Sequence, residues 1–220
     1  MTELIALARS PRLGSAAVLA RGTPIAAVLL VALSTALALV EAARFAETVP
    51  VDSVVFGEGR SAAVTALIAT FGRDSAALVV YLFQQAYGWL ILVTGLTPFF
   101  IWILGSTAVQ AAARLGGARA PFVPMLVLFG YATALTRIPP DLLGLALPRS
   151  GLAQLAGTAA LLWLAIIVFR GIEAHYAVLG GRALTTLIVA VVFFYLVPLA
   201  LIVLAAVAII IAAVILDYAH

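Results

Sequence analysis

Five long stretches of almost unbroken apolar residues lie between Pro24 and Leu216, and most charged residues fall in the gaps between them. The hydrocarbon core of a bilayer is about 30 Å thick, so a helix needs roughly 20 apolar residues to cross it. Only 10% of the 220 residues are charged, whereas a soluble globular domain has about 25%. The sequence therefore predicts an all-α, polytopic integral membrane helical bundle with about five transmembrane helices and additional short interfacial helices.

The composition excludes several other classes of protein. A soluble Ala-rich bundle would show a polar stripe on each helix, and residues 152–169 and 184–216 show none. The chain has no cysteine, which excludes a disulfide framework and thiolate metal sites. A formal charge of +3, dispersed along the chain, does not indicate a nucleic-acid partner.

The chain is expected to divide into a short cytoplasmic segment and one membrane domain. Residues 1–22 are basic and partly amphipathic, and Pro11 interrupts them, which favours helices lying at the cytoplasmic interface. Residues 23–217 are predicted to form a single transmembrane helical domain. A cleaved secretory signal is the alternative for the first apolar run, but that run is long for a signal and Ala36-Leu-Ala38 is a weak cleavage site.

The predicted membrane spans are 24–43, 89–113, 122–138, 151–170 and 183–216. Pro139-Pro140-Asp141 is expected to stop the third span. The second span is expected to be kinked near Pro98 and preceded by a partly embedded helix at 75–87. A full hairpin turning near Gln84–Gly88 is the alternative.

The final apolar run, 183–216, exceeds the length of one crossing. We predict a tilted helix, kinked at Pro198, that projects past the membrane.

The distribution of arginines predicts an N-in, C-out orientation. With five spans, the inside segments hold seven Arg against Glu3 and Glu173, giving +5. The outside segments hold five Arg against seven acidic residues, giving −2. Short loops carry this difference, and the positive-inside rule applies to short loops.

Few residues suggest chemistry, and the sequence predicts a protein that is not an enzyme, with no catalytic residue, no metal site and no cofactor. Glu173 and His175 could be an acid–base pair, but residues two apart do not share a helix face. The favoured interpretation is an interfacial cluster that pairs Glu173 with an arginine. Within the apolar runs, a possible polar groove is formed by Gln84, Gln85, Gln110 and Gln154, although such residues more often form interhelical hydrogen bonds.

Two short motifs resemble the Yip1-domain family. The first contains a Gly-Gly turn, a basic residue and a Gly-Tyr-Ala triplet, seen here as Gly116, Gly117, Arg119, Gly130 and Tyr131. The second is similar to the family's last loop and final span, seen here as Glu173, His175, Gly181 and Arg182. The resemblance covers about residues 6–200.

The resemblance implies a five-span membrane protein. Eukaryotic family members are associated with Rab GTPases and vesicle traffic, but this chain lacks their long soluble amino-terminal region. It looks more like a short prokaryotic member, which implies a multi-pass protein of a prokaryotic plasma membrane.

Two functions from different classes follow. The first is a non-enzymatic accessory or scaffold subunit, or a membrane-organising protein, that acts through helix–helix contacts. Its expected partners are the lipid bilayer and other membrane protein subunits. The alternative is a channel, permease subunit or lipid-moving protein that uses the polar groove. An intramembrane enzyme is disfavoured because no nucleophile–base pair is visible.

Overall fold

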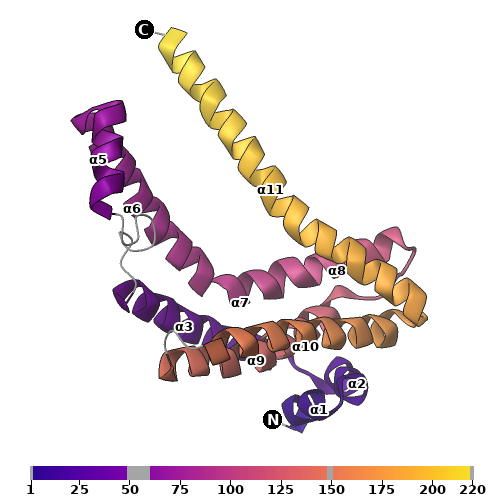
Figure 1. The fold of residues 1–220 in the computed structure, drawn as a ribbon. Helices are drawn as coiled ribbons and strands as arrows, with labels where there is room; N and C mark the ends of the chain where they lie inside the picture. Colours follow the sequence, from indigo (N-terminus) through magenta and orange to yellow (C-terminus); the bar gives the residue numbers. More distant parts are fainter. Residues whose placement is uncertain (1, 49–59, 148–150, 219–220) are drawn as a thin grey trace. The chain divides into compact units, whose positions relative to one another are not determined.

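The computed structural model of the chain describes residues 2–48, 60–147 and 151–218, and no strand occurs among them. Figure 1 shows the helices, which are α1 (Thr2–Arg9), α2 (Pro11–Arg21), α3 (Pro24–Thr48), α5 (Arg60–Phe71), α6 (Arg73–Gly95), α7 (Thr97–Phe100), a π-helical turn (Ile101–Gly105), α8 (Ser106–Leu115), α9 (Phe122–Ala146), α10 (Gly151–Tyr176) and α11 (Gly180–Tyr218).

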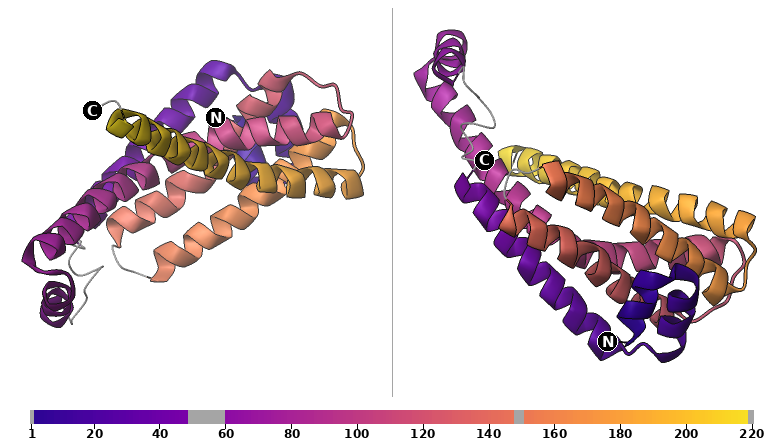
Figure 2. Two further views of the ribbon diagram at one scale, coloured as in Figure 1. Left: turned by 90° about the horizontal axis from the view of Figure 1, so that it is seen from above. Right: turned by 60° about the horizontal axis from the view of Figure 1, so that its bottom comes forward.

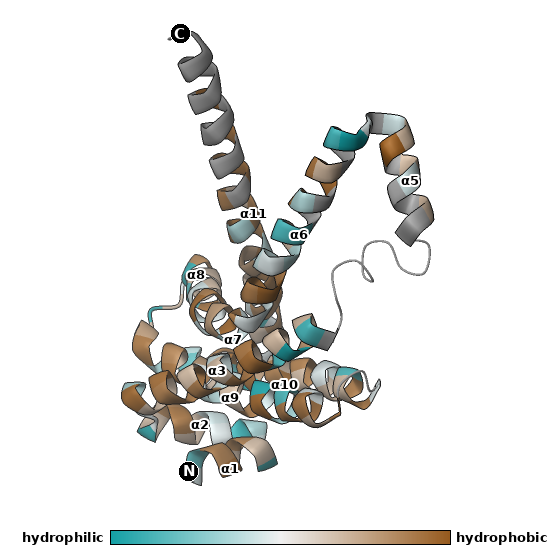
Figure 3. Ribbon diagram, turned by 90° about the vertical axis from the view of Figure 1, so that its left-hand side faces the viewer, coloured by the Kyte–Doolittle hydropathy of each residue, from teal (hydrophilic) through white to brown (hydrophobic). Residues whose placement is uncertain are grey.

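Five of these helices are long and apolar enough to cross a membrane. The candidate spans are Pro24–Glu47, Ala77–Gly95, Phe122–Ala146, Gly151–Tyr176 and Gly180–Leu201. Hydrophobic residues dominate α3, α9 and α10 when the chain is coloured by hydropathy (Figure 3). Helices satisfy their own backbone hydrogen bonds, which is what the bilayer core demands of a spanning segment. The predicted all-α fold with about five candidate transmembrane helices is confirmed.

The helices of the chain group into two compact units. Unit 1 contains Met1–Pro24, Ile101–Phe129 and Ile166–His220, and unit 2 contains Ile25–Phe100 and Gly130–Ala165. The boundaries fall inside α9 and α10, so each of these helices contributes to both units.

In unit 1, the amino-terminal helices pack on the membrane helices. Ser10 caps α2, and Pro11 occupies its first turn, so Pro11 separates α1 from α2 as predicted. Leu7 and Val18 are fully buried, and the Ser15 hydroxyl donates a hydrogen bond to the Ile167 carbonyl of α10 (3.3 Å). These two helices therefore bury part of their apolar surface against protein.

Unit 1 also brings α8 alongside the first part of α11 (Figures 1 and 2). The two helices run antiparallel, since one cavity between them is lined by Leu104 and Val197 and another by Ala112 and Thr186. The π-helical turn packs on α9 through two contacts. The Trp102 indole N–H donates to the Leu126 carbonyl (2.9 Å), and a Cβ on Gly105 would lie 2.6 Å from the Phe129 ring.

In unit 2, α3 and α9 run parallel. A Cβ on Gly130 would lie 2.7 Å from the Ala27 Cβ, and a Cβ on Gly144 would overlap the Glu41 side chain. Fourteen residues separate the two contacts on both helices, which corresponds to about 21 Å of helix. Parallel neighbours in a membrane are joined by an odd number of crossings, which agrees with the predicted single crossing between α3 and α9.

The second candidate span lies in α6, and the short helix α7, the π-helical turn and α8 follow it. Leu96 interrupts the helix next to Thr97-Pro98, close to the predicted kink, because Pro98 has no N–H to donate. Helix α6 is continuous through Gln84–Gly88, so the alternative turn at that point is not formed.

Length and hydropathy select Ala77–Gly95 as the candidate span, whereas the sequence predicts 89–113. The segments from α7 to α8 are each too short to qualify by length. The candidate span and the predicted span therefore overlap only at residues 89–95.

Four helices run further than the sequence predicts, and the first of them, α3, ends at Thr48 rather than at residue 43. Helix α10 ends at Tyr176 and α11 covers Gly180–Tyr218 as one helix with Pro198 inside. Helix α9 does not stop at Pro139-Pro140 but continues to Ala146. Pro139 and Pro140 have no N–H to donate, so this turn of α9 lacks two backbone hydrogen bonds. Arg137 and Asp141, on either side of the two prolines, form an i,i+4 ion pair (3.2 Å) that stabilises the turn.

Replacing Gly130 with Ala tests the close approach of α3 and α9. The added methyl group would collide with Ala27, and overpacking of this kind costs about 1–3 kcal/mol. We expect a lower free energy of unfolding and a lower thermal midpoint, measured by intrinsic fluorescence in detergent.

Gly157→Ala in α10 is the matched control, because no heavy atom lies within 4 Å of its added Cβ. It should be neutral or slightly stabilising. Equal effects of the two variants would contradict the parallel packing.

Candidate functional site

Two connections far apart in sequence meet in unit 1. The first joins α8 to α9 through residues 116–121, and the second joins α10 to α11 through residues 177–179. Gly117 has φ +84°, a left-handed conformation that glycine adopts without a steric cost. The Gly116-Gly117 pair therefore forms the turn that the sequence motif predicts. Ala177 is also left-handed (φ 51°) and reverses the chain after α10.

Gln110 ties these connections together. The Tyr176 hydroxyl donates a 2.5 Å hydrogen bond to Gln110 Oε1, and Gln110 Nε2 donates to the Ala120 carbonyl (3.0 Å). Gln110 and Tyr176 are buried, where an unpaired amide or hydroxyl would be costly. We call Gln110, Ala120, Pro121, His175 and Tyr176 the loop clamp.

His175 completes the loop clamp. Its Nε2 lies 2.8 Å from the Pro121 carbonyl oxygen. A carbonyl oxygen only accepts hydrogen bonds, so Nε2 carries the proton and donates it. The neighbouring Tyr176 ring packs edge-on against the imidazole, with 4.7 Å between ring centroids.

Glu173 faces a different partner. It pairs with Arg170 at 2.7 Å, so the predicted ion pair with an arginine is confirmed. Arg170, Glu173 and His175 lie in the last turns of α10, not in a loop as the sequence suggested. Glu173 and His175 are each engaged elsewhere, and they do not form an acid–base pair.

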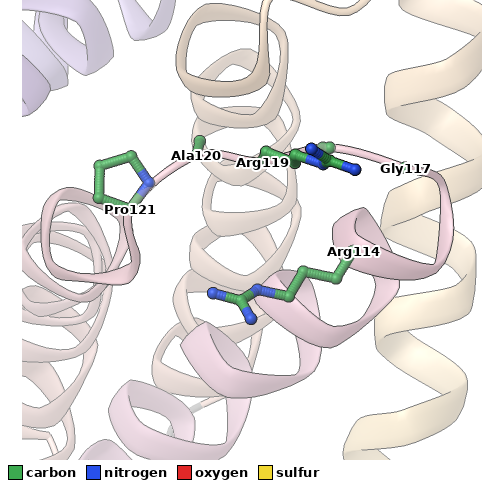
Figure 4. A pocket seen from close by; sticks show the side chains of 6 residues that line it. Arg114, Gly117, Arg119, Ala120 and Pro121 are labelled. Atoms are coloured by element: carbon green, nitrogen blue, oxygen red, sulfur yellow. The ribbon is translucent and has the colours of Figure 1, made fainter.

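An open, positively charged cavity of about 730 Å³ adjoins the loop clamp. It is lined by Arg114 of α8 and by loop residues that include Gly117, Arg119 and Pro121 (Figure 4). The two arginine side chains extend in different directions in this view. A second cavity of about 470 Å³ is lined by Gly116, Tyr176 and Arg182, among others. Cationic walls of this kind attract anionic groups at a membrane surface.

The structure gathers most, but not all, of the predicted motif residues. Gly116, Gly117, Arg119, His175 and Arg182 line the cavities or form the clamp. Gly130 instead contacts Ala27 of α3, and the neighbouring Tyr131 is buried within α9. Gly181 is exposed near the start of α11.

The four glutamines of the expected groove do not share one environment. Gln84 and Gln85 are exposed on α6, and Gln154 is exposed on α10. The side-chain amide of Gln110 is occupied within the loop clamp. Among the described residues, neither cavity beside the loop clamp is lined by any of the four glutamines.

Sequence reasoning missed a charged cluster in unit 2, formed by Glu41 of α3 and by Arg137 and Asp141 of α9. Asp141 is 2% exposed, and its carboxyl group interacts with the guanidinium group of Arg137 and with the carboxyl group of Glu41. Because the third span was predicted to end at residue 138, Asp141 was placed outside the membrane helix. The i,i+4 spacing of Arg137 and Asp141 was the signal that could have revealed the pair.

Within the described ranges, no group of three or more His, Asp or Glu side chains is arranged to hold a metal ion. The contacts of the loop clamp are hydrogen bonds and a ring contact.

Tyr176→Phe tests the loop clamp. It removes the donor to Gln110 Oε1 and leaves that oxygen buried without a partner, which costs about 1–3 kcal/mol. We expect a lower thermal midpoint and faster amide hydrogen exchange in residues 116–121.

Tyr195→Phe is the matched control, because Tyr195 is exposed on α11. It should leave both measurements unchanged. If Tyr176→Phe behaves like this control, the hydrogen bond does not hold the loop.

Comparisons with protein-family models, with curated proteins and with solved structures give no match for this chain.

Proposed function

We propose that this chain is a non-enzymatic, multi-pass membrane protein with the organisation of the Yip1 family, and that it acts as an accessory or scaffold subunit through helix–helix contacts. The proposed location is a prokaryotic plasma membrane, which the resemblance to short family members supports. The proposed partners are membrane protein subunits.

The length and composition of α11 carry this proposal. Its 39 residues correspond to about 58 Å of helix, roughly twice the thickness of the hydrocarbon core. No charged residue lies between Arg182 and Asp217. Tilting shortens the projection of a helix only modestly, so a long apolar segment is left beyond one crossing.

The exposed apolar side chains of this segment need a contact partner other than water. Leu204, Val207 and Ile211 are exposed, and their spacing places them on one helix face. Exposed apolar area costs about 25 cal/mol per Å² in water. Contiguous exposed apolar surface of this kind marks interaction sites, and a helix of a partner subunit would bury it.

The loop clamp supports a structural role for the motif residues. The side chains of Gln110, Glu173 and His175 are each engaged by a hydrogen bond or an ion pair. The alternative, a channel or permease subunit with a polar groove, has less support because Gln84, Gln85 and Gln154 face outward.

Site-specific photo-crosslinking in the native membrane tests this proposal. A photoreactive amino acid placed at Ile211 should give discrete protein adducts, because this position lies beyond the span on the proposed contact face. The same probe at Ile188 is the control, since Ile188 is exposed within the candidate span and should meet lipid. Adducts to lipid alone from both positions would contradict the proposal.

A further inference from the structure

The charged cluster of unit 2 borders a cavity of about 240 Å³ between α3, α6 and α9. Glu41 and Arg137 supply its charged wall, and Phe45, Leu90 and Ile91 supply apolar wall. Tyr87 and Thr94 of α6 also line it. The cavity lies toward the carboxyl-terminal ends of α3 and α9, which face outward in the predicted orientation.

Not every polar atom of the cluster has a hydrogen-bond partner. Arg137 pairs with Asp141 through a terminal nitrogen at 3.2 Å, and the two side chains are 23% and 3% exposed. The buried Arg137 Nε and Asp141 Oδ2 atoms lack a hydrogen-bond partner. Charged groups inside a membrane protein are costly and mark functional sites.

Glu41 is the acidic group of the cluster that lines the cavity, together with Arg137. Its carboxylate packs against Gly144 and interacts with Asp141, whereas the ion pair of Arg137 is made with Asp141. The nearby Arg44 donates a hydrogen bond to the Leu145 carbonyl (3.2 Å). The lining of the cavity therefore includes both an acidic side chain and a guanidinium group.

We propose that this cavity binds a zwitterionic phosphoethanolamine headgroup. The primary ammonium group would donate to the Glu41 carboxylate, and the phosphate would accept from Arg137. Charge-assisted hydrogen bonds of both kinds are stronger than neutral ones. The apolar wall formed by Phe45, Leu90 and Ile91 suits the glycerol and acyl portion of a phospholipid. This inference is independent of the proposed accessory role.

Native mass spectrometry of the purified chain in detergent tests the proposal. Phosphatidylethanolamine should bind more tightly than phosphatidylcholine, whose quaternary ammonium has no N–H, and than phosphatidylglycerol, which has no cation. Glu41→Gln should weaken phosphatidylethanolamine binding about tenfold, because one charge-assisted hydrogen bond is lost. Glu47→Gln is the control, since Glu47 is exposed on the same helix and should change nothing.

A second variant separates loss of the site from loss of the fold. Ile91→Trp would fill the cavity without changing its charge and should also abolish the preference for phosphatidylethanolamine, while the helical circular dichroism signal remains.

Competition by free phosphoethanolamine distinguishes a lipid headgroup from a soluble ligand. If it competes with the lipid in a Glu41-dependent manner, the site accepts soluble ligands as well. Equal binding of the three lipids, unaffected by Glu41→Gln, would overturn the proposal.

Discussion

Close packing of α3 against α9 is the contact on which the arrangement of unit 2 depends. Gly130 and Gly144 have no side chains, so the backbone of α9 can approach Ala27 and Glu41 of α3. Without a hydrophobic driving force between helices in lipid, close approach at small residues is a main source of helix association. The parallel arrangement of the two helices agrees with the predicted topology, in which one crossing separates them.

The same contact positions the charged cluster. Glu41 reaches α9 only because Gly144 leaves room for it, which brings the carboxylate to the turn that Arg137 and Asp141 stabilise. A bilayer penalises isolated charges, so an arginine and two carboxylates at this depth depend on one another. The backbone geometry that fixes the topology thus also creates the polar cavity.

The sequence predicted the features that depend on local chemistry. Hydrophobic length identified five helices, Pro98 marked the break in the second crossing, and the Gly116-Gly117 pair marked the turn after α8. Features that depend on tertiary partners were not predictable. Pro139-Pro140 is normally a stop signal, yet α9 continues because Arg137 and Asp141 bridge the two prolines.

The same distinction between local features and tertiary contacts applies to the candidate site. The pairing of Glu173 with an arginine follows from residues three apart on one helix, and it was predicted. The contacts of Gln110 with Tyr176 and of His175 with Pro121 join residues 66 and 54 positions apart. No periodicity in the sequence encodes such contacts, so Gln110 was assigned to a groove that the described residues do not form.

Cysteine accessibility most directly tests the central claim that five crossings place the termini on opposite sides. The chain has no native cysteine, so each single substitution provides one defined thiol. A membrane-impermeant maleimide applied to intact cells should label cysteines at Asp74 and Asp217. Cysteines at Thr2, Leu115 and Leu179 should react only after permeabilisation. Labelling of positions 2 and 217 from the same side would contradict this topology.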